Sequence, residues 1–226
     1  MSISGCIGLS TARSVSDTFT TSIDNSSITE LAVSTRIGSI SIEAHDGDQV
    51  EIDGEKHAAT EGDLAAVTLD DYIEAGTLHL EVDTDDVDNE LFGIQLRPDP
   101  SIDLDILIPA GIDIGTISTV TGSIHLTNLG GEPEIEGVTG DIFLDTIDSN
   151  VTIEVTTGEV QVQNIEGNVT VDSTTGDVAV THVTDDVSIE TTTGDITVEH
   201  VGGDLTASTI TGDIDTDGID GTVDID

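Results

Sequence analysis

The sequence is poor in cations, in aromatic side chains and in cysteine. Only four of its 226 residues are Lys or Arg, against 47 Asp or Glu, which gives a formal net charge of −43. None of the cations follows Arg97. A polyanion of this kind cannot neutralise phosphate groups, so DNA, RNA and anionic membrane headgroups are poor partners. A surface so rich in carboxylates is typical of salt-loving archaea, because concentrated salt screens like charges from one another.

The single cysteine, Cys6, excludes an internal disulfide and a paired-cysteine metal site. It follows Ile3, Ser4 and Gly5, and small residues ahead of a cysteine resemble the end of a lipoprotein signal. The charged and apolar regions that belong before such a cysteine do not fit, because Met1 stands only five residues upstream. Two hypotheses stay open. Either the true start lies further upstream and Cys6 carries a lipid anchor at the cell surface, or Cys6 is an incidental thiol of a cytoplasmic protein.

What the sequence does contain is a nine-residue repeat marked by glycine. Steps of nine from Gly122 to Gly221 reach ten glycines in twelve positions. Every second step is also preceded by threonine, so the full repeat is eighteen residues long and has two unequal halves. Alternating aliphatic residues follow the glycines, as in GDIFL and GDVAV, and predict short half-buried strands. Glycine and β-branched residues at this density disfavour helix throughout the chain.

Fixed-period repeats of this length are typical of solenoids, whose units bury their apolar faces only by stacking. We therefore predict an all-β fold: a single parallel β-solenoid, similar to a β-helix or β-roll, with 18-residue coils and irregular N-terminal strands. Residues 1–27 are polar and rich in Ser and Thr, which predicts a disordered tail or tether. The solenoid domain is expected over 28–226, irregular between 53 and 99, with regular coils from about residue 116.

Three features resemble the "putative adhesin" domain family of unknown function, which is found across bacteria and archaea. They are GSISIEAHDGDQVEI near the start, the strand–proline segment IDLDILIPAGIDI, and the run of Thr-Gly-Asp repeats that follows. The resemblance covers residues 28–226, roughly. It implies a β-solenoid of the cell surface or envelope, often lipid-anchored, with no catalytic residues to carry over.

Stacked coils place residues eighteen apart on adjacent strands, about 4.8 Å from one another. One such column holds carboxylates in consecutive coils, and like charges at this spacing destabilise unless a cation or concentrated salt intervenes. Carboxylate oxygens suit Ca²⁺ or Mg²⁺, so a cation-binding ladder is one interpretation of the column. The other interpretation is a solvated corner whose side chains hydrogen-bond to the turn. The residues are Asp141, Glu159, Asp177, Asp195 and Asp213.

Two further columns could carry ligand-binding chemistry. His182 and His200 lie eighteen residues apart, and two imidazoles beside Glu199 could ligate a transition metal; an outward position near a corner is the alternative. The threonines that precede alternate glycines form either a binding surface or a hydrogen-bonded ladder within the coils. Their positions are Thr121, Thr139, Thr157, Thr175, Thr193 and Thr211.

The chain contains no GxSxG, P-loop or HExxH motif, so we expect no enzymatic activity. We expect a monomeric cell-surface module of a halophilic microbe for adhesion or scaffolding, with no cofactor other than weakly bound Ca²⁺ or similar cations. Its Asp and Thr rows would bind a surface protein or a glycan multivalently, and only a lipid on Cys6 would attach it to a membrane. The alternative is a sensory or regulatory envelope domain that binds a partner protein through residues 53–99, which include Tyr72 and Phe92.

Overall fold

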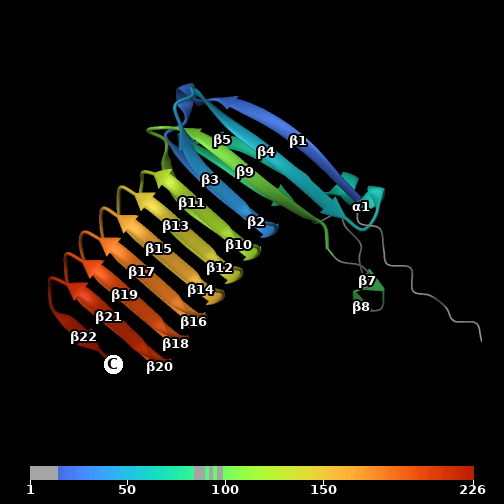
Figure 1. Ribbon diagram of the computed structural model, residues 1–226. Coiled ribbons are helices and arrows are strands. Elements are labelled where there is room, and N and C mark those ends of the chain that lie inside the picture. The colour runs from blue at the N-terminus through green and yellow to red at the C-terminus, as the bar shows by residue number, and fades with distance from the viewer. Residues whose placement is uncertain (1–14, 84–89, 92–93, 96–98) are drawn as a thin grey trace, which may run out of the picture.

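The computed structural model describes residues 15–83, 90–91, 94–95 and 99–226. Two ten-stranded sheets face each other along a rod and are joined by tight corners (Figure 1). The predicted all-β parallel solenoid is confirmed. We call the two sheets A and B. In spatial order, sheet A holds β1 (Val15–Asp24), β4 (Gln49–Ala58), β9 (Ser101–Pro109), β3 (Ile40–His45), β11 (Ile124–Leu129), β13 (Ile142–Ile147), β15 (Val160–Ile165), β17 (Val178–Val183), β19 (Ile196–Val201) and β21 (Ile214–Ile219).

Sheet B is built from strands that alternate with those of sheet A along the regular part of the chain. Its regular strands pair in parallel with strands eighteen residues on, as in Val169 opposite Val187. In spatial order, sheet B holds β22 (Val223–Ile225), β20 (Leu205–Thr211), β18 (Val187–Thr193), β16 (Val169–Thr175), β14 (Val151–Thr157), β12 (Glu134–Thr139), β10 (Asp113–Thr121), β2 (Glu30–Ile37), β6 (Thr77–Asp83) and β5 (Thr68–Glu74). A separate pair is formed by β7 (Glu90–Leu91) and β8 (Ile94–Gln95).

Each regular coil turns from sheet B into sheet A at a Thr-Gly pair. Gly176 shows why the position requires glycine. Its φ is +142°, and a Cβ there would lie 1.9 Å from the carbonyl oxygen of Gly158 in the neighbouring coil. The amide of Gly158 donates to the carbonyl oxygen of Thr175 at 3.0 Å, and the equivalent bond recurs in the other coils from Gly122 to Gly194. The eighteen-residue period of the sequence is therefore the stacking register of the fold.

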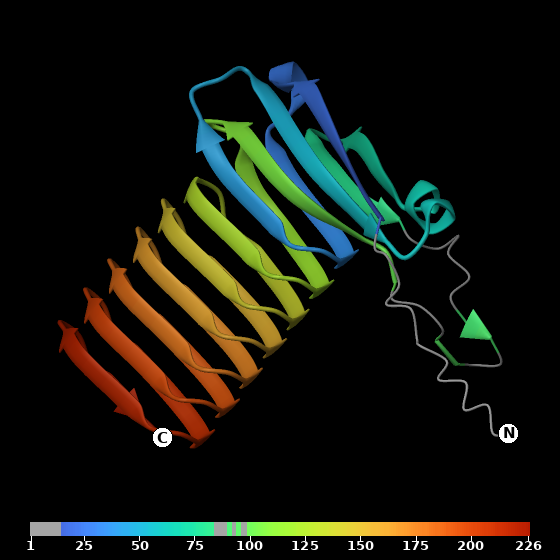
Figure 2. The ribbon, with the colours of Figure 1, turned by 45° about the vertical axis from the view of Figure 1, so that its right-hand side comes forward.

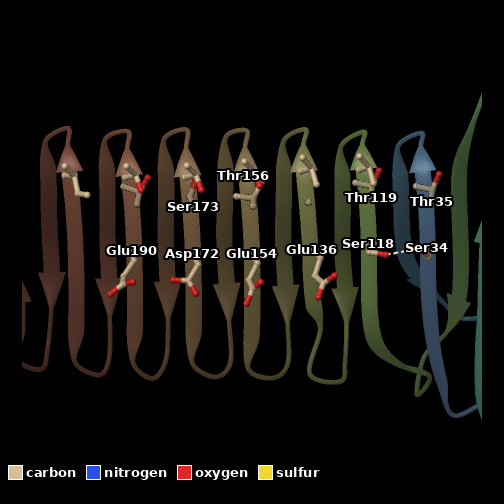
Figure 3. Close-up of a pocket in the computed structure, with 18 of the residues that line it drawn as sticks. Ser34, Thr35, Ser118, Thr119, Glu136, Glu154, Thr156, Asp172, Ser173 and Glu190 are labelled. Atoms are coloured by element: carbon tan, nitrogen blue, oxygen red, sulfur yellow. Dashed lines mark hydrogen bonds between the residues drawn. The ribbon is translucent and has the colours of Figure 1, made fainter. Parts of the chain in front are cut away.

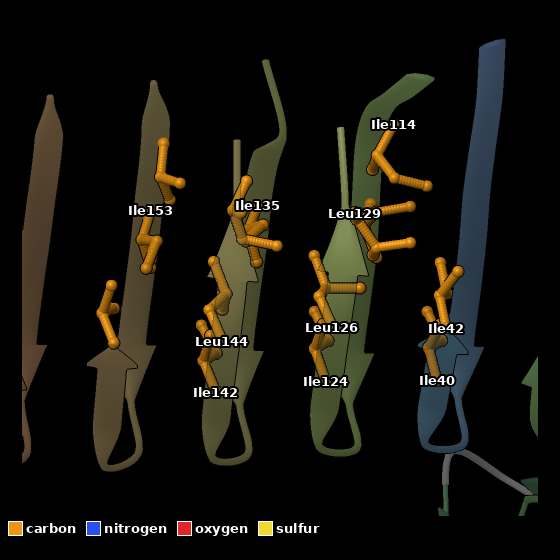
Figure 4. Packing of buried hydrophobic residues seen from close by; sticks show 14 of the residues in the cluster. Ile40, Ile42, Ile114, Ile124, Leu126, Leu129, Ile135, Ile142, Leu144 and Ile153 are labelled. Carbon is orange, nitrogen blue, oxygen red and sulfur yellow. The ribbon is translucent and has the colours of Figure 1, made fainter. Parts of the chain in front are cut away.

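The core is a narrow aliphatic column between the two sheets (Figure 4). Ile124 and Leu126 of β11, like Ile142 and Leu144 of β13, point inward and are buried. A third inward residue, Leu129, is buried at the end of β11. Because inward side chains of successive coils stack directly, each coil covers the apolar surface of the one beside it.

The order of strands at the N-terminal end of the rod does not follow the order of the chain (Figure 2). The coil made of β2 and β3 lies between the coil of β6 and β9 and the coil of β10 and β11. Thus Ile40 pairs with Leu104 on one side and with Ile124 on the other. Beyond these coils, β4 pairs antiparallel with β9, and β5 pairs antiparallel with β6. The sequence predicts irregular strands here but not their interleaving.

The structure corrects the extent of the predicted tether. Residues 15–24 fall within it, yet they form β1, which pairs antiparallel with β4 over its whole length. Phe19 and Ile23 are partly buried and pack against the core, which gives the strand a reason to be ordered. A short 3-10 helix, η1 (Asn25–Ser27), then leads into β2.

The expectation that helix is disfavoured throughout is also corrected. One short helix, α1 (Glu61–Ala66), connects β4 to β5. Thr60 caps its start, and the threonine hydroxyl accepts the amide of Asp63 at 3.2 Å. A threonine cap, acidic residues in the first turn and two alanines at the end favour a helix locally, because the repeat pattern does not extend into this segment.

Candidate functional site

The outer face of sheet B carries a row of carboxylates that the sequence analysis did not single out. Strand alternation sends every second side chain of β12, β14, β16 and β18 to solvent. At one of these positions all four strands hold exposed acidic residues, which lie directly opposite one another on adjacent strands. We call Glu136, Glu154, Asp172 and Glu190 the acidic row. The signal was available in the sequence as the same eighteen-residue spacing.

A groove of about 900 Å³ runs along this face from β2 to β20 (Figure 3). The acidic row lies along it, and serines continue the row at both ends, at Ser34, Ser118 and Ser208. A second row of the lining holds Thr156, Thr174 and Thr192 in the middle coils. Its outer coils place aliphatic side chains in the open: Val120, Val138 and Ile210 are 47%, 46% and 80% exposed. Exposed aliphatic side chains gathered in a hollow are a feature of contact surfaces.

Two hydroxyl groups beside the groove are buried without a partner. Ser173 and Thr191 are 8% and 5% exposed, and their hydroxyl oxygens form no hydrogen bond within the described residues. In the equivalent position of β20, the Thr209 hydroxyl donates to the carbonyl oxygen of Gly194 at 3.3 Å. Val155 fills the same position of β14 with no hydroxyl at all. The position therefore accepts an aliphatic side chain, and an unpaired hydroxyl there costs stability.

Replacing Thr191 by valine should raise the free energy of unfolding by about 1 kcal/mol, because valine keeps the shape and removes an unpaired polar group. Thermal unfolding followed by circular dichroism would show this as a higher melting temperature. Thr209→Val is the matched control, since it removes a hydroxyl that has a partner and should bring no gain. A melting temperature of Thr191→Val below that of the parent chain would mean that the hydroxyl is paired in solution.

The predicted cation ligands lie at the corners between the sheets, outside the groove. Their side chains are exposed and hydrogen-bond to the backbone of the next coil. Asp141 accepts the amide of Glu159 at 2.9 Å, Asp177 accepts that of Asp195, and Asp195 accepts that of Asp213, each at the same 2.9 Å. We call these five residues, Asp141, Glu159, Asp177, Asp195 and Asp213, the corner row. The corner row ties successive coils together.

Cation binding by the corner row stays a prediction. Within the described residues, no three His, Cys, Asp or Glu side chains gather closely enough to hold a metal ion. If the row binds Ca²⁺, millimolar CaCl₂ should restore the β-type circular dichroism spectrum at low KCl, where KCl of equal ionic strength does not. The double variant Asp177→Asn and Asp195→Asn keeps the hydrogen-bond acceptors and should lose that response. Full recovery in molar KCl with no effect of calcium would show that the row only needs screening.

The predicted threonine row ends the strands of sheet B next to the corner glycines. Its carbonyl oxygens accept the glycine amides of the neighbouring coil, as Thr157 does from Gly140 at 3.0 Å. The side chains from Thr121 to Thr211 are exposed at these corners. The backbone of this row therefore holds the stack together, and its hydroxyls are available to solvent.

His182 and His200 lie side by side, with their ring centroids 4.8 Å apart and their planes 1° from parallel. Both have a left-handed backbone, with φ of 56° and 58°. The residues of the other coils in this column share that conformation, and it lets each strand bend so that the next residue turns inward. In the described part of the chain, the two imidazoles and Glu199 do not form a three-ligand metal cluster. The same left-handed conformation occurs at Asn128, Thr146, Asn164 and Gly218.

An exposed aromatic pair lies on the outer face of sheet B at its N-terminal end. Tyr72 of β5 is opposite His79 of β6, and their rings stack with centroids 4.8 Å apart. The Tyr72 hydroxyl donates to a carboxylate oxygen of Glu81 at 2.7 Å. This bond and the nearby negative charge raise the pKa of Tyr72 above its usual value, because ionisation would break the bond. Tyr72 therefore stays a neutral ring, 43% exposed.

Two predicted residues, Cys6 and Phe92, lie outside the described residues. Lipid attachment at Cys6 therefore stays a prediction, as does a contact through Phe92. Among the helices that the structure describes, none has the length and apolar character needed to cross a membrane.

No family model matches the chain, and no curated protein matches it. Solved structures that resemble it bear the description that the sequence resemblance predicts. One, from Bacteroides fragilis NCTC 9343, is described as a putative adhesin; it is 14% identical, with a TM-score of 0.39, over 93% of this chain and 97% of that one. Another, from Clostridium sporogenes ATCC 15579, is described as a putative cell adhesion protein, with 9% identity, a TM-score of 0.41 and coverage of 93% and 99%. A third, from Parabacteroides distasonis ATCC 8503, is described as a putative lipid binding protein, with 12% identity, a TM-score of 0.33 and coverage of 93% and 96%. At these values the likeness establishes no function for this chain.

Proposed function

We propose that this chain is a non-enzymatic adhesion or scaffolding module that binds an extended polymer along the groove of sheet B. The groove itself carries the proposal. Its carboxylates and hydroxyls recur in register over consecutive coils, so the rod offers one weak contact many times. Repeated weak contacts multiply affinity when the ligand is repetitive too. The proposal moves the contact surface from the corner row to the groove.

Adhesion to a panel of immobilised cell-envelope polysaccharides and glycoproteins tests the proposal. Beads coated with the chain should be retained by at least one polymer of the panel. Replacing the acidic row, by Glu136→Gln, Glu154→Gln, Asp172→Asn and Glu190→Gln, should reduce retention roughly tenfold or more, since charged contacts of the groove are lost.

The matched control neutralises two adjacent carboxylates on the opposite outer face. Glu199 of β19 and Asp217 of β21 lie opposite each other on sheet A and are exposed. The variant Glu199→Gln with Asp217→Asn should therefore adhere like the parent chain. Retention by no polymer, or equal loss in both variants, contradicts the proposal.

The same proposal puts the module at the outer surface of a salt-loving microbe, held by a lipid on Cys6. The net charge of −43 supports the salt-loving origin, and the small residues before Cys6 support the anchor. Growth of a halophilic host with a clickable fatty acid should label the chain but not its Cys6→Ser variant. Equal labelling of both would remove Cys6 from the proposal.

A second candidate function is a sensory or regulatory envelope domain. It is favoured by β5, which lies at the end of sheet B and leaves Ile73 45% exposed. An edge strand with an exposed aliphatic side chain can pair with a strand of a partner protein. Ile73→Asp should abolish such pairing and spare polymer adhesion, whereas neutralising the acidic row should do the reverse.

A further inference from the structure

The aromatic pair and the groove belong to one continuous face. Glu81 of β6 lies opposite Ser34 of β2, Ser34 lies opposite Ser118 of β10, and Ser118 lies opposite Glu136 of β12. The line that starts beside Tyr72 therefore continues, strand by strand, into the acidic row. Figure 3 shows its middle part, where the Ser118 hydroxyl donates to that of Ser34 at 3.1 Å.

A cavity of about 260 Å³ fills the space between the aromatic pair and the groove. Its lining includes His79 and Glu81 from β6, together with Ser34 and Ser118, which also line the groove. We call the aromatic pair, this cavity and the groove the sheet B track. The track joins three kinds of surface: a flat apolar platform, a hollow lined with hydroxyls, and a row of carboxylates.

Each part of the track points to a property of its ligand. The stacked rings of Tyr72 and His79 present apolar area of the kind that packs on the C–H face of a sugar ring. The hydroxyls of the serines and threonines donate to and accept from polyhydroxyl groups. The acidic row is a line of acceptors without a cation among its lining residues, so it favours donors that carry positive charge.

We infer that the sheet B track binds an extended glycan whose sugars carry free amino groups. This inference rests on the proposed function and names the class of polymer that the module recognises. A cationic peptide would satisfy the acidic row but would not use the aromatic platform. A neutral glycan would use the platform and the hydroxyls but would leave the carboxylates facing one another. A chain of amino sugars uses all three parts.

The chain carries its own reporter for this interaction. It contains one tyrosine and no tryptophan, so tyrosine emission reports on Tyr72 alone. Titration with a soluble glucosamine oligomer at physiological salt should change this emission saturably. Calorimetry of the same titration gives the affinity for variants that lack the tyrosine.

Tyr72→Ala should weaken binding of the glucosamine oligomer roughly three- to tenfold, whereas Tyr72→Phe should retain it, because the ring supplies the contact. Glu154→Gln with Asp172→Asn should weaken binding about tenfold or more. The control pair Glu199→Gln with Asp217→Asn, on sheet A, should bind like the parent chain. Circular dichroism checks that every variant is folded.

Two comparison ligands complete the experiment. The N-acetylated oligomer should bind more weakly, and oligolysine of equal charge should bind without any dependence on Tyr72. Equal affinity for the acetylated oligomer, equal affinity for oligolysine, or an unchanged affinity in Tyr72→Ala would each overturn the inference. Retention of a different envelope polymer through the acidic row would leave the proposed function intact while this inference fails.

Discussion

Replacing Gly176 by alanine should destabilise the solenoid by about 3 kcal/mol or more, the largest effect we expect from one added methyl group. The new Cβ would lie 1.9 Å from the carbonyl oxygen of Gly158, and the residue would have to hold a φ of +142°. The backbone cannot retreat, because the coil is bonded to a neighbour on each side. Thermal and urea unfolding followed by circular dichroism would measure the loss.

Gly137→Ala is the matched control for this prediction. Gly137 lies inside β12, where an added Cβ would meet Val155 at 3.5 Å and Ile142 at 3.8 Å, which are ordinary contacts. Alanine should therefore be neutral or stabilise by roughly 0.5–1 kcal/mol, because glycine in a strand costs conformational entropy. Equal losses in the two variants would show that the corner glycines have no special role.

Salt should change the stability of this chain more than any single outer-face substitution. In roughly 0.1 M salt the Debye length is about 10 Å, so neighbouring carboxylates repel, whereas in molar salt it falls to about 3 Å. The melting temperature should therefore rise steeply with KCl. Neutralising all four residues of the acidic row should stabilise the chain by about 1–3 kcal/mol at low salt, since three adjacent like-charged pairs are removed.

The gain from neutralising the acidic row should nearly vanish in molar KCl. The control variant carries Thr156→Ser, Thr174→Ser and Thr192→Ser, which alter the same groove without changing its charge. That variant should follow the salt dependence of the parent chain. An undiminished gain for the neutralised row in molar KCl would show that packing, and not repulsion, limits the stability of this face.

The regular coils could be predicted because every structural requirement repeats at a fixed interval. The glycine at each corner, the alternating aliphatic residues and the third inward residue, such as Leu129, recur every eighteen residues and are buried or left-handed as their positions require. The acidic row has the same period but was missed. The search started from residues that follow glycine, whereas Glu154 and Asp172 lie in the middle of strands of sheet B.

The N-terminal third could not be predicted in the same way, because its contacts are distant in the chain and do not repeat. The Gly38 amide donates to the carbonyl oxygen of Thr121, and Ser16 pairs with His57. No local pattern encodes such partners. The aromatic pair illustrates the same limit: Tyr72 was a candidate contact, but its place on the face of the groove follows only from the pairing of β5, β6 and β2.

The interleaved coil of β2 and β3 sets an order of events during synthesis. When β2 and β3 leave the ribosome, neither neighbouring coil exists, because β6, β9, β10 and β11 are still to be translated. The aliphatic faces of Leu31, Val33 and Ile42, all buried in the finished rod, must therefore wait until about residue 129 has emerged. The later coils can then be added one at a time on a completed template. The segment made early is thus enclosed late, and a newly made chain is most exposed to aggregation before its repetitive part begins.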